Sequence, residues 1–407
     1  MLGLNGTVIF WGDSLRAFGL GAALIVLTMA ATCAILEKPT WRRTAILSIT
    51  AILSVQTLYQ NAVFFAAIGI GGWLVCWMRK DKSAAVKILI AALVAVMSLL
   101  PYLESVLRWQ HATTIRPGFS SKAALDNFNT ILAFPLPQYV WLWTLLGLAV
   151  IGLGAAAWFR RPASSDQSKS LLAPAELQVF AGVVLLLSVL GYLVFLHFAA
   201  LITSPWYFLP LMAVAAVCFD LGITLPALPR MLRTVVWGVL IATAGLSVPF
   251  ALRDLNCRVT NADLVAKYLN ENVSAEDYVV VTPWYLGISF DRYYRAAAKW
   301  DTLPPMTDHS THRFDLVPAS AADEVRAVQP VLDRVASTLQ SGHRVWVAGL
   351  MTIPAPGHAA TTAEGRFLSE HSRSFDPVDL KIKGQTSDYE DFSLLLADGW
   401  RTNPPAK

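Results

Sequence analysis

The sequence predicts a polytopic α-helical membrane protein of about eight spans that carries a soluble α/β domain at its C-terminus. Of the 407 residues, 55% are hydrophobic and only 15% are charged, whereas a soluble protein carries about 25% charged residues. The imbalance is local, because apolar runs fill Leu15–Leu252 while charged and apolar residues mix from Arg253 onward. We therefore predict a transmembrane domain over residues 1–252 and a soluble domain over residues 253–407.

Eight apolar runs approach the ~20 residues that a helix needs to cross the hydrocarbon core of a bilayer. The second, third and seventh runs lie near the lower limit of about 17 residues. Between the second and third runs, Leu58–Asn61 is consistent with a tight turn between two spans or with a polar interruption in one bent helix. The runs cover approximately residues 17–36, 43–57, 62–78, 84–107, 138–158, 176–199, 205–222 and 233–252.

Basic residues alternate between the segments that connect these runs, which predicts the orientation of the chain in the membrane. Positively charged connections face the cytoplasm. The N-terminus and the C-terminal domain then face outward, to the periplasm or lumen. The cytoplasmic set contains eleven basic residues and the outer set three, namely Lys38, Arg42, Arg43, Arg79, Lys80, Lys82, Arg160, Arg161, Lys169, Arg230 and Arg233 against Arg108, Arg116 and Lys122.

Composition and motifs argue against several functional classes. The basic residues sit at span ends and not on a soluble face, so we expect no nucleic-acid partner. No Gly-rich phosphate loop follows the strands predicted below, so no nucleotide cofactor is expected. His309 and His312 share one loop, but two histidines in a Pro-rich loop are more typical of a solvent-facing segment than of a metal site. We predict neither cofactor nor metal.

The soluble domain shows alternating helix and strand patterns. Thr260 and Asn261 are candidate N-caps of a helix, and Asp277–Pro283 has the pattern of a buried strand. A second amphipathic helix follows and ends at Ser341-Gly342. His343–Gly349 is predicted as another strand, and Phe392–Ala397 is a third candidate. This order favours a small α/β domain with a partly parallel sheet.

Charged residues near the outer ends of two spans are candidate site residues. Asp13 and Arg16 are three residues apart, so on a helix they share a face and can pair with each other. Alternatively Arg16 grips a phosphate while Asp13 orients a polar substrate. Glu104 lies near the end of the fourth run with Arg108 one turn on, and such a pair is either a functional site or an interfacial ion pair.

Two further outer segments are candidates. The long connection 108–137 contains Arg116 and several Ser, Thr and Asn, and it is either a lid over a cleft or a simple connector. Trp206 and Tyr207 belong at the outer interface, where such residues usually anchor a span. The same rings also suit stacking against a sugar or packing against a lipid chain.

Three stretches resemble the polyprenyl-phosphate-sugar-dependent glycosyltransferases of the GT-C class, which includes protein O-mannosyltransferases and bacterial aminoarabinose transferases. Phe10–Gly19 is similar to the family's outer segment with an acid, an Arg and an aromatic residue. Leu58–Asn61 resembles the break between the next two spans, and Ser204–Pro210 resembles the aromatic-Leu-Pro entry of a late span. The soluble tail also resembles periplasmic tails of bacterial members.

The resemblance implies transfer of a sugar from a polyprenyl-phosphate carrier to a lipid, glycan or protein acceptor on the outer face of the membrane. It implies a bacterial inner-membrane location with the C-terminal domain in the periplasm. A carboxylate, Asp13 or Glu104, would act as general base. Cations and polar or aromatic residues would contact the carrier phosphate or the substrate, namely Arg16, Tyr59, Asn61, Arg108, Arg116, Trp206 and Tyr207.

The sequence departs from the family pattern at several positions. Asp13 stands where Glu is commoner, Phe18 where Tyr is, and Trp206 where Arg is frequent. Family members begin with additional spans and an acidic outer loop, and the resemblance implies that this sequence starts after that region. The alternative interpretation is a catalytically incomplete paralogue or a membrane scaffold. A third interpretation is a transporter or flippase, and it is less favoured because the sequence shows no pair of internal repeats.

Overall fold

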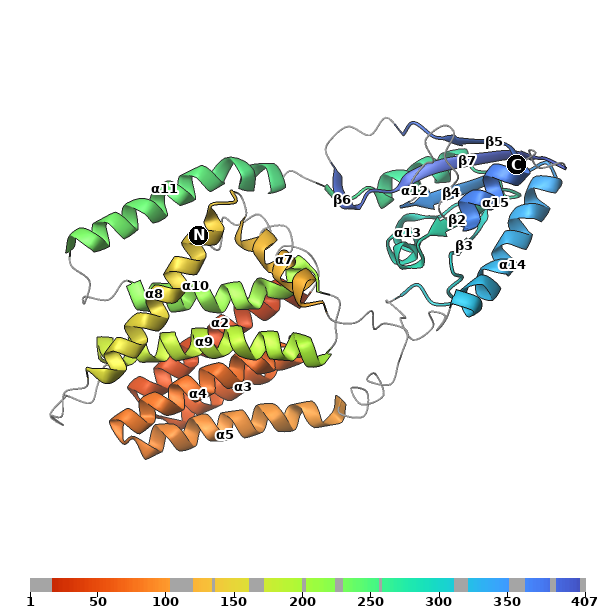
Figure 1. The fold of residues 1–407 in the computed structure, drawn as a ribbon. Helices are drawn as coiled ribbons and strands as arrows, with labels where there is room; N and C mark the ends of the chain where they lie inside the picture. The colour runs from red at the N-terminus through yellow and green to blue at the C-terminus, as the bar shows by residue number, and fades with distance from the viewer. Residues whose placement is uncertain are drawn as a thin grey trace. The chain divides into compact units, whose positions relative to one another are not determined.

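The chain folds, in the computed structural model, into two compact units, a helical unit over Met1–Leu255 and a sheet unit over Asn256–Lys407 (Figure 1). The residues that the structure describes are 17–102, 120–133, 136–160, 172–199, 203–223, 230–255, 258–310, 321–350, 363–380 and 386–402.

The described part of the first unit is built from helices joined by turns. The long helices are α2 (Ala17–Glu37), α3 (Trp41–Thr57), α4 (Asn61–Arg79), α5 (Lys82–Leu99), α8 (Tyr139–Phe159), α9 (Pro174–Ala199), α10 (Leu209–Ile223) and α11 (Arg230–Leu255). The shorter elements are α7 (Ser121–Leu132) and the 3-10 turns η2 (Leu100–Tyr102) and η4 (Pro205–Phe208).

Seven helical segments in the described ranges are long and apolar enough to cross a membrane, which identifies an integral membrane protein. The expected span 43–57 is not among these seven segments. It corresponds to α3, whose 17 residues lie at the lower limit of about 17 residues for a span. Seven of the expected spans are thus found in the described residues, and the span at α3 stays a prediction. The seven are Ala17–Glu37, Asn61–Arg79, Lys82–Tyr102, Tyr139–Phe159, Pro174–Phe198, Pro205–Gly222 and Arg233–Arg253.

The break at residues 58–61 is a tight turn between two separate helices. α3 ends at Thr57, and Leu58 adopts an extended conformation with its N–H bonded to the Ser54 carbonyl. α4 begins at Asn61. Of the two interpretations left open by the sequence, the bent continuous helix is therefore excluded.

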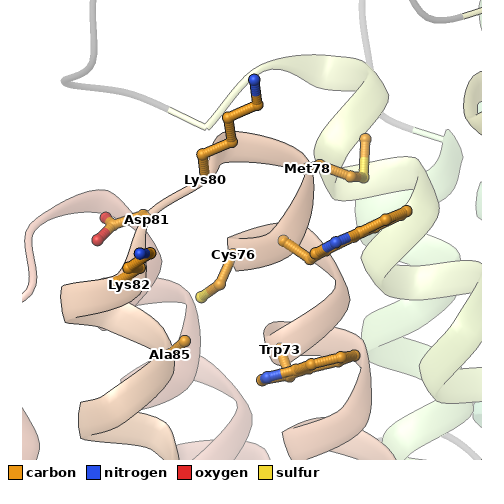
Figure 2. A pocket seen from close by; sticks show the side chains of 8 residues that line it. Trp73, Cys76, Met78, Lys80, Asp81, Lys82 and Ala85 are labelled. Carbon is orange, nitrogen blue, oxygen red and sulfur yellow. The ribbon is translucent and has the colours of Figure 1, made fainter.

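The turn between α4 and α5 consists of Lys80 and Asp81 (Figure 2). Lys80 closes α4 in the left-handed region, with φ of 55°, and its N–H bonds the Cys76 and Trp77 carbonyls. Asp81 is the N-cap of α5, where its carboxylate accepts a hydrogen bond of 3.0 Å from the Ala84 N–H. These two residues thus provide hydrogen-bond partners for free backbone groups at the end of α4 and at the start of α5.

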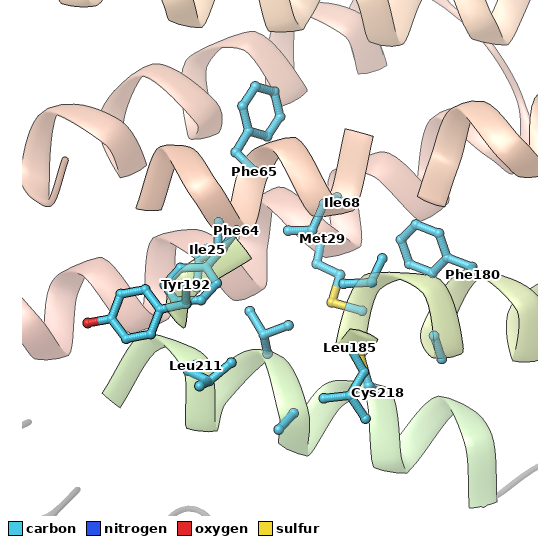
Figure 3. Packing of buried hydrophobic residues seen from close by; sticks show 14 of the residues in the cluster. Ile25, Met29, Phe64, Phe65, Ile68, Phe180, Leu185, Tyr192, Leu211 and Cys218 are labelled. Carbon is cyan, nitrogen blue, oxygen red and sulfur yellow. The ribbon is translucent and has the colours of Figure 1, made fainter. Parts of the chain in front are cut away.

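The core of the helical unit lies between α2, α4, α9 and α10 (Figure 3). Large side chains such as Ile25, Phe64 and Tyr192 are fully buried there. Helices α8 and α9 approach each other closely at Gly154, where an added Cβ would lie 2.7 Å from the Gln178 carbonyl oxygen. Small residues at such crossings let helix backbones pack tightly in a bilayer.

The sheet unit contains a five-stranded mixed sheet in the order β3-β2-β4-β7-β5. Strands β3, β2 and β4 are parallel, and β7 is antiparallel to both β4 and β5. The expected partly parallel sheet is thus confirmed. The strands are β1 (Arg258–Thr260), β2 (Tyr278–Thr282), β3 (Lys299–Thr302), β4 (Val345–Gly349), β5 (Ser372–Pro377), β6 (Thr386–Glu390) and β7 (Ser393–Trp400), and β1 pairs with β6 apart from the main sheet.

Helices cover both faces of this sheet. One apolar cluster joins it to α12 (Ala262–Asn272) and α13 (Gly287–Tyr293), and a second joins it to α14 (Ala321–Gln340) and α15 (Ala363–His371). Such two-sided burial agrees with the strand 278–282, whose residues are all buried instead of alternating between buried and exposed.

Asn261 is the N-cap residue of α12, but its side chain does not cap the helix. Its amide donates to the Phe392 carbonyl at 3.0 Å, and its carbonyl accepts from the Phe392 N–H at 2.7 Å. Thr260 instead accepts from the Ala262 N–H at 3.1 Å. The sequence predicted a cap at Thr260 and at Asn261. The side chain of Asn261 does not cap the helix because it bonds the distant backbone of residue 392.

Candidate functional site

The turn at residues 58–61 and the entry to α10 lie against each other, although 147 residues separate Gln60 from Tyr207. The Gln60 side-chain amide donates a 3.0 Å hydrogen bond to the Tyr207 carbonyl. The Tyr192 hydroxyl lies 2.7 Å from that carbonyl and 3.1 Å from Gln60 Oε1. Tyr192 is fully buried on α9, so one hydroxyl ties three helix segments together.

Aromatic rings gather around this junction, and we call residues Phe18, Tyr59, Tyr102, Trp206 and Tyr207 the aromatic end of the helical unit. The Phe18 ring meets Tyr207 edge-on at 5.7 Å, and the Trp206 and Tyr207 rings lie 6.3 Å apart. Tyr59 is 50% exposed and lies 5.8 Å from Tyr102. Three predicted site residues, Tyr59, Trp206 and Tyr207, are thus brought to one end of the unit.

Asn61 has a different environment from its neighbour Tyr59. Its side chain is fully buried, and its amide donates to the Gly21 carbonyl and to Ser54 Oγ, each at 3.0 Å. Its side-chain oxygen is buried without a hydrogen-bond partner in the described ranges. In this conformation Asn61 joins α2, α3 and α4, and its predicted contact with a substrate remains a prediction.

The connection 108–137 contains helix α7, which packs on η4. The Asn127 amide donates to the Thr203 carbonyl at 2.7 Å and to its hydroxyl at 3.1 Å. The Phe128 ring lies 5.3 Å from Phe208. The last part of this connection is therefore an ordered helix held at the aromatic end, and it exposes the carboxylate of Asp126.

Five predicted site residues lie outside the described ranges. These are the two candidate bases and the three arginines, Asp13, Arg16, Glu104, Arg108 and Arg116. Their roles stay predictions. The connection 103–119 directly follows Tyr102, and one residue, Ala17, separates the segment 1–16 from Phe18, so both segments lie close to residues of the aromatic end in the sequence.

The opposite end of the helical unit contains a mostly buried ion pair. Arg79 of α4 donates to both carboxylate oxygens of Glu176 on α9, at 2.7 and 2.6 Å, and to the Leu36 carbonyl at 2.8 Å. The two side chains are only 16% and 13% exposed. This pair joins α2, α4 and α9 where the basic connections lie, so it has a structural role.

Polar and aromatic residues of the sheet unit mostly support its fold. Arg295 donates to the carbonyls of Asp291 and Arg292 at the end of α13. The Trp300 ring lies 4.4 Å from His309. Burial lowers the pKa of His309, and the nearby carboxylates offset this effect only in part. Among the described residues there is no group of three or more His, Cys, Asp or Glu that could hold a metal ion, and His312 lies outside them.

Two residues at the junction were not predicted from the sequence. Gln60 lies inside the break at residues 58–61, but only its neighbours Tyr59 and Asn61 were predicted as site residues. Tyr192 lies within an apolar run. A hydroxyl at that depth needs a partner in the bilayer, and this requirement is the signal that could have identified it.

The amino-acid sequence matches no protein-family model and no curated protein at a significant level.

Proposed function

We propose that this chain is a membrane glycosyltransferase that moves a sugar from a polyprenyl-phosphate carrier to an acceptor at the aromatic end of the helical unit. The observation that carries the proposal is the hydrogen bond between Gln60 and the Tyr207 carbonyl. It joins the two described segments that resemble the GT-C family, 58–61 and 204–210. Convergence of distant motifs at one place supports a shared site.

The chemistry of this end suits a lipid-linked sugar. Aromatic faces such as Tyr59 and Trp206 bind the apolar face of a sugar ring while a polar edge stays hydrated. The prenyl chain of the donor would lie among the membrane-length helices. A donor tethered in the lipid requires no nucleotide-binding loop.

The proposed reaction is a displacement at the anomeric carbon. Asp13 or Glu104 accepts the proton of an acceptor hydroxyl or amine, and the acceptor atom forms a bond to that carbon. The bond from carbon to the phosphate oxygen breaks, and its electron pair leaves with polyprenyl phosphate. Arg16, Arg108 or Arg116 would hold the departing phosphate through charge-assisted hydrogen bonds. A periplasmic position of the sheet unit in a bacterial inner membrane belongs to the same proposal.

A second candidate function, a non-catalytic membrane partner, is favoured by a specific observation. Four polar side chains near the junction, Gln60, Asn61, Asn127 and Tyr192, all make interhelical or intersegment hydrogen bonds. Groups engaged in this way hold the structure together and are less available to a substrate. A scaffold would need these bonds and no catalytic carboxylate.

The experiment that tests the transferase is sugar transfer from a labelled polyprenyl-phosphate donor in membranes that contain this chain. Turnover that is lost in Arg16→Ala supports the assigned phosphate site. Trp206→Ala should reduce transfer at least tenfold, while Trp141→Ala, which removes a 70% exposed ring from α8, should leave it unchanged.

Failure of the assay also has a defined meaning. Absence of turnover with a panel of polyprenyl-phosphate sugars, in membranes where the inserted chain is folded, would contradict the transferase and favour the scaffold. Equal loss in Trp206→Ala and Trp141→Ala would place the effect in membrane anchoring and would remove Trp206 from the site.

A further inference from the structure

A groove lies at the end of the helical unit opposite the aromatic end, between the last turns of α4 and the first turns of α5 (Figure 2). It has a volume of about 510 Å³, which is within the range of small-molecule sites. Its apolar wall includes Trp73, Trp77, Met78 and Ala85, and Lys80 and Lys82 stand at its rim.

The wall is apolar and exposes two large rings. Trp73 and Trp77 are one helical turn apart, and each is 55% exposed. Trp77 also stacks on Trp158 of α8 at 5.7 Å. Trp73 precedes Lys80 by seven residues, so it lies about 10 Å from Lys80 along the axis of α4, toward the middle of the helix. The groove therefore extends from a charged rim to a depth that an acyl chain occupies in a bilayer.

The rim carries two exposed ammonium groups. Neither Lys80 nor Lys82 forms an ion pair with a described residue. Asp81 lies between them in the sequence, but its carboxylate accepts from the Ala84 N–H as the cap of α5. Arg79, the preceding residue, pairs with Glu176. The two lysines are thus the cations that this rim offers to a ligand.

The backbone of Lys80 adopts a conformation that is uncommon for a residue with a side chain. Among the described residues it is the one non-glycine with a positive φ. A helix that ends in this conformation usually has Gly or Asn at the position. The left-handed conformation therefore does not itself require a lysine, and the charge of Lys80 also fits the basic connections on this side of the helical unit.

We propose that this groove binds one anionic phospholipid of the surrounding leaflet. Its phosphate lies between Lys80 and Lys82, and one acyl chain packs along Trp73, Trp77 and Met78. Tryptophan rings are suited to the boundary between headgroup and hydrocarbon, and lysines near a membrane surface attract anionic lipids. A free phosphate ion would leave the apolar wall unfilled, so the lipid is the occupant that fits both parts. The proposal does not depend on the transferase.

Native mass spectrometry of the full chain in detergent, titrated with phosphatidylglycerol or phosphatidylcholine, tests the proposal. We expect one phosphatidylglycerol to be retained on the order of tenfold more tightly than phosphatidylcholine. Lys80→Gln combined with Lys82→Gln should abolish this preference. Arg42→Gln, which removes an exposed charge from the start of α3 outside the groove, should preserve it.

A second variant separates a seated lipid from diffuse attraction to positive charge. Ala85→Phe fills the groove and keeps both lysines, so it should also lower phosphatidylglycerol retention to the phosphatidylcholine level. The proposal is overturned if Arg42→Gln weakens binding as much as the lysine pair does, or if Ala85→Phe has no effect. It is equally overturned if millimolar inorganic phosphate displaces the lipid completely, because the site would then recognise phosphate alone.

Discussion

Gln60 donates a 3.0 Å hydrogen bond from its side-chain amide to the main-chain carbonyl of Tyr207. The contact joins the turn between α3 and α4 to the entry of α10. The buried Tyr192 hydroxyl shares the same carbonyl. Because a backbone carbonyl inside a bilayer must find a donor, these two side chains stabilise the irregular backbone at η4.

Tyr192→Phe should destabilise the helical unit by about 0.5–2 kcal/mol. The change removes one hydroxyl and leaves Gln60 Oε1 with one donor fewer, while the ring packing is kept. Thermal unfolding in detergent would measure the effect as a lowered midpoint. Tyr59→Phe removes a hydroxyl from a half-exposed ring and serves as the control, with an unchanged midpoint. Equal midpoints for the two variants would show that the buried hydroxyl contributes nothing.

Glu176→Gln should destabilise the helical unit by about 2 kcal/mol or more. The carboxylate accepts two hydrogen bonds from Arg79 and one of 2.7 Å from the Ala173 N–H, and the substitution leaves a mostly buried guanidinium without its counter-charge. The matched change Glu37→Gln breaks a 3.8 Å pair with Arg43 whose side chains are a third or more exposed. Such exposed pairs contribute about 0–1 kcal/mol. Chemical unfolding that ranks Glu37→Gln as the more damaging change would refute this reasoning.

Gly349→Ala should disrupt the sheet unit far more than Gly342→Ala. Gly349 has a φ of 144°, and a Cβ added there would overlap the Thr282 carbonyl of the neighbouring strand β2. Gly342 has a φ of 81° with open space around it, so its substitution involves only backbone strain of about 1 kcal/mol. Hydrogen exchange of the β2 and β4 amides should accelerate strongly in the first variant and slightly in the second. Comparable exchange in both variants would contradict the predicted overlap.

Acidification should loosen the junction of β2 and β4 through Asp277. Burial raises the pKa of this carboxyl, but hydrogen bonds from the Ser274 and Arg344 N–H groups, the Trp346 indole and the Arg344 guanidinium outweigh burial and lower it below 3.8. A depressed folded-state pKa means that the stabilisation is complete above about pH 4 and is lost as the pH falls through the folded-state value.

The pH dependence of amide exchange at Tyr278, whose N–H bonds the Arg344 carbonyl, would measure this loss. Asp277→Asn should already exchange faster at pH 7 and should show a weaker acid response. A wild-type protein whose exchange follows only the intrinsic pH dependence down to pH 2 would argue against the role of Asp277.

Local patterns accounted for most elements of the fold. Apolar runs identified the positions of seven membrane-length helices because the bilayer imposes both their length and their composition. The pattern Asp277–Pro283 predicted a buried strand, which is β2 at Tyr278–Thr282, and the turn at Ser341-Gly342 predicted the end of α14 at Gln340. The run 43–57 stays a predicted span, because the 17 residues of α3 lie at the lower limit of the length that crosses a bilayer.

The candidate site depended on information that no local pattern contains. Tyr59 and Asn61 are two residues apart in one polar turn, yet one is half-exposed and the other is fully buried. Which of them meets solvent is decided by where α2 packs, because the Gly21 carbonyl accepts the hydrogen bond from Asn61.

The sequence by itself determined that this is a membrane protein with an α/β unit at its C-terminus, since hydrophobic length and strand periodicity are properties of neighbouring residues. Only the tertiary structure decided that Gln60 meets Tyr207, that Asn261 bonds residue 392, and that Trp73 of α4 and Lys82 of α5 line one groove. Each of these contacts depends on how whole helices or strands pack, and packing is settled by the shapes of surfaces formed from residues far apart in the chain.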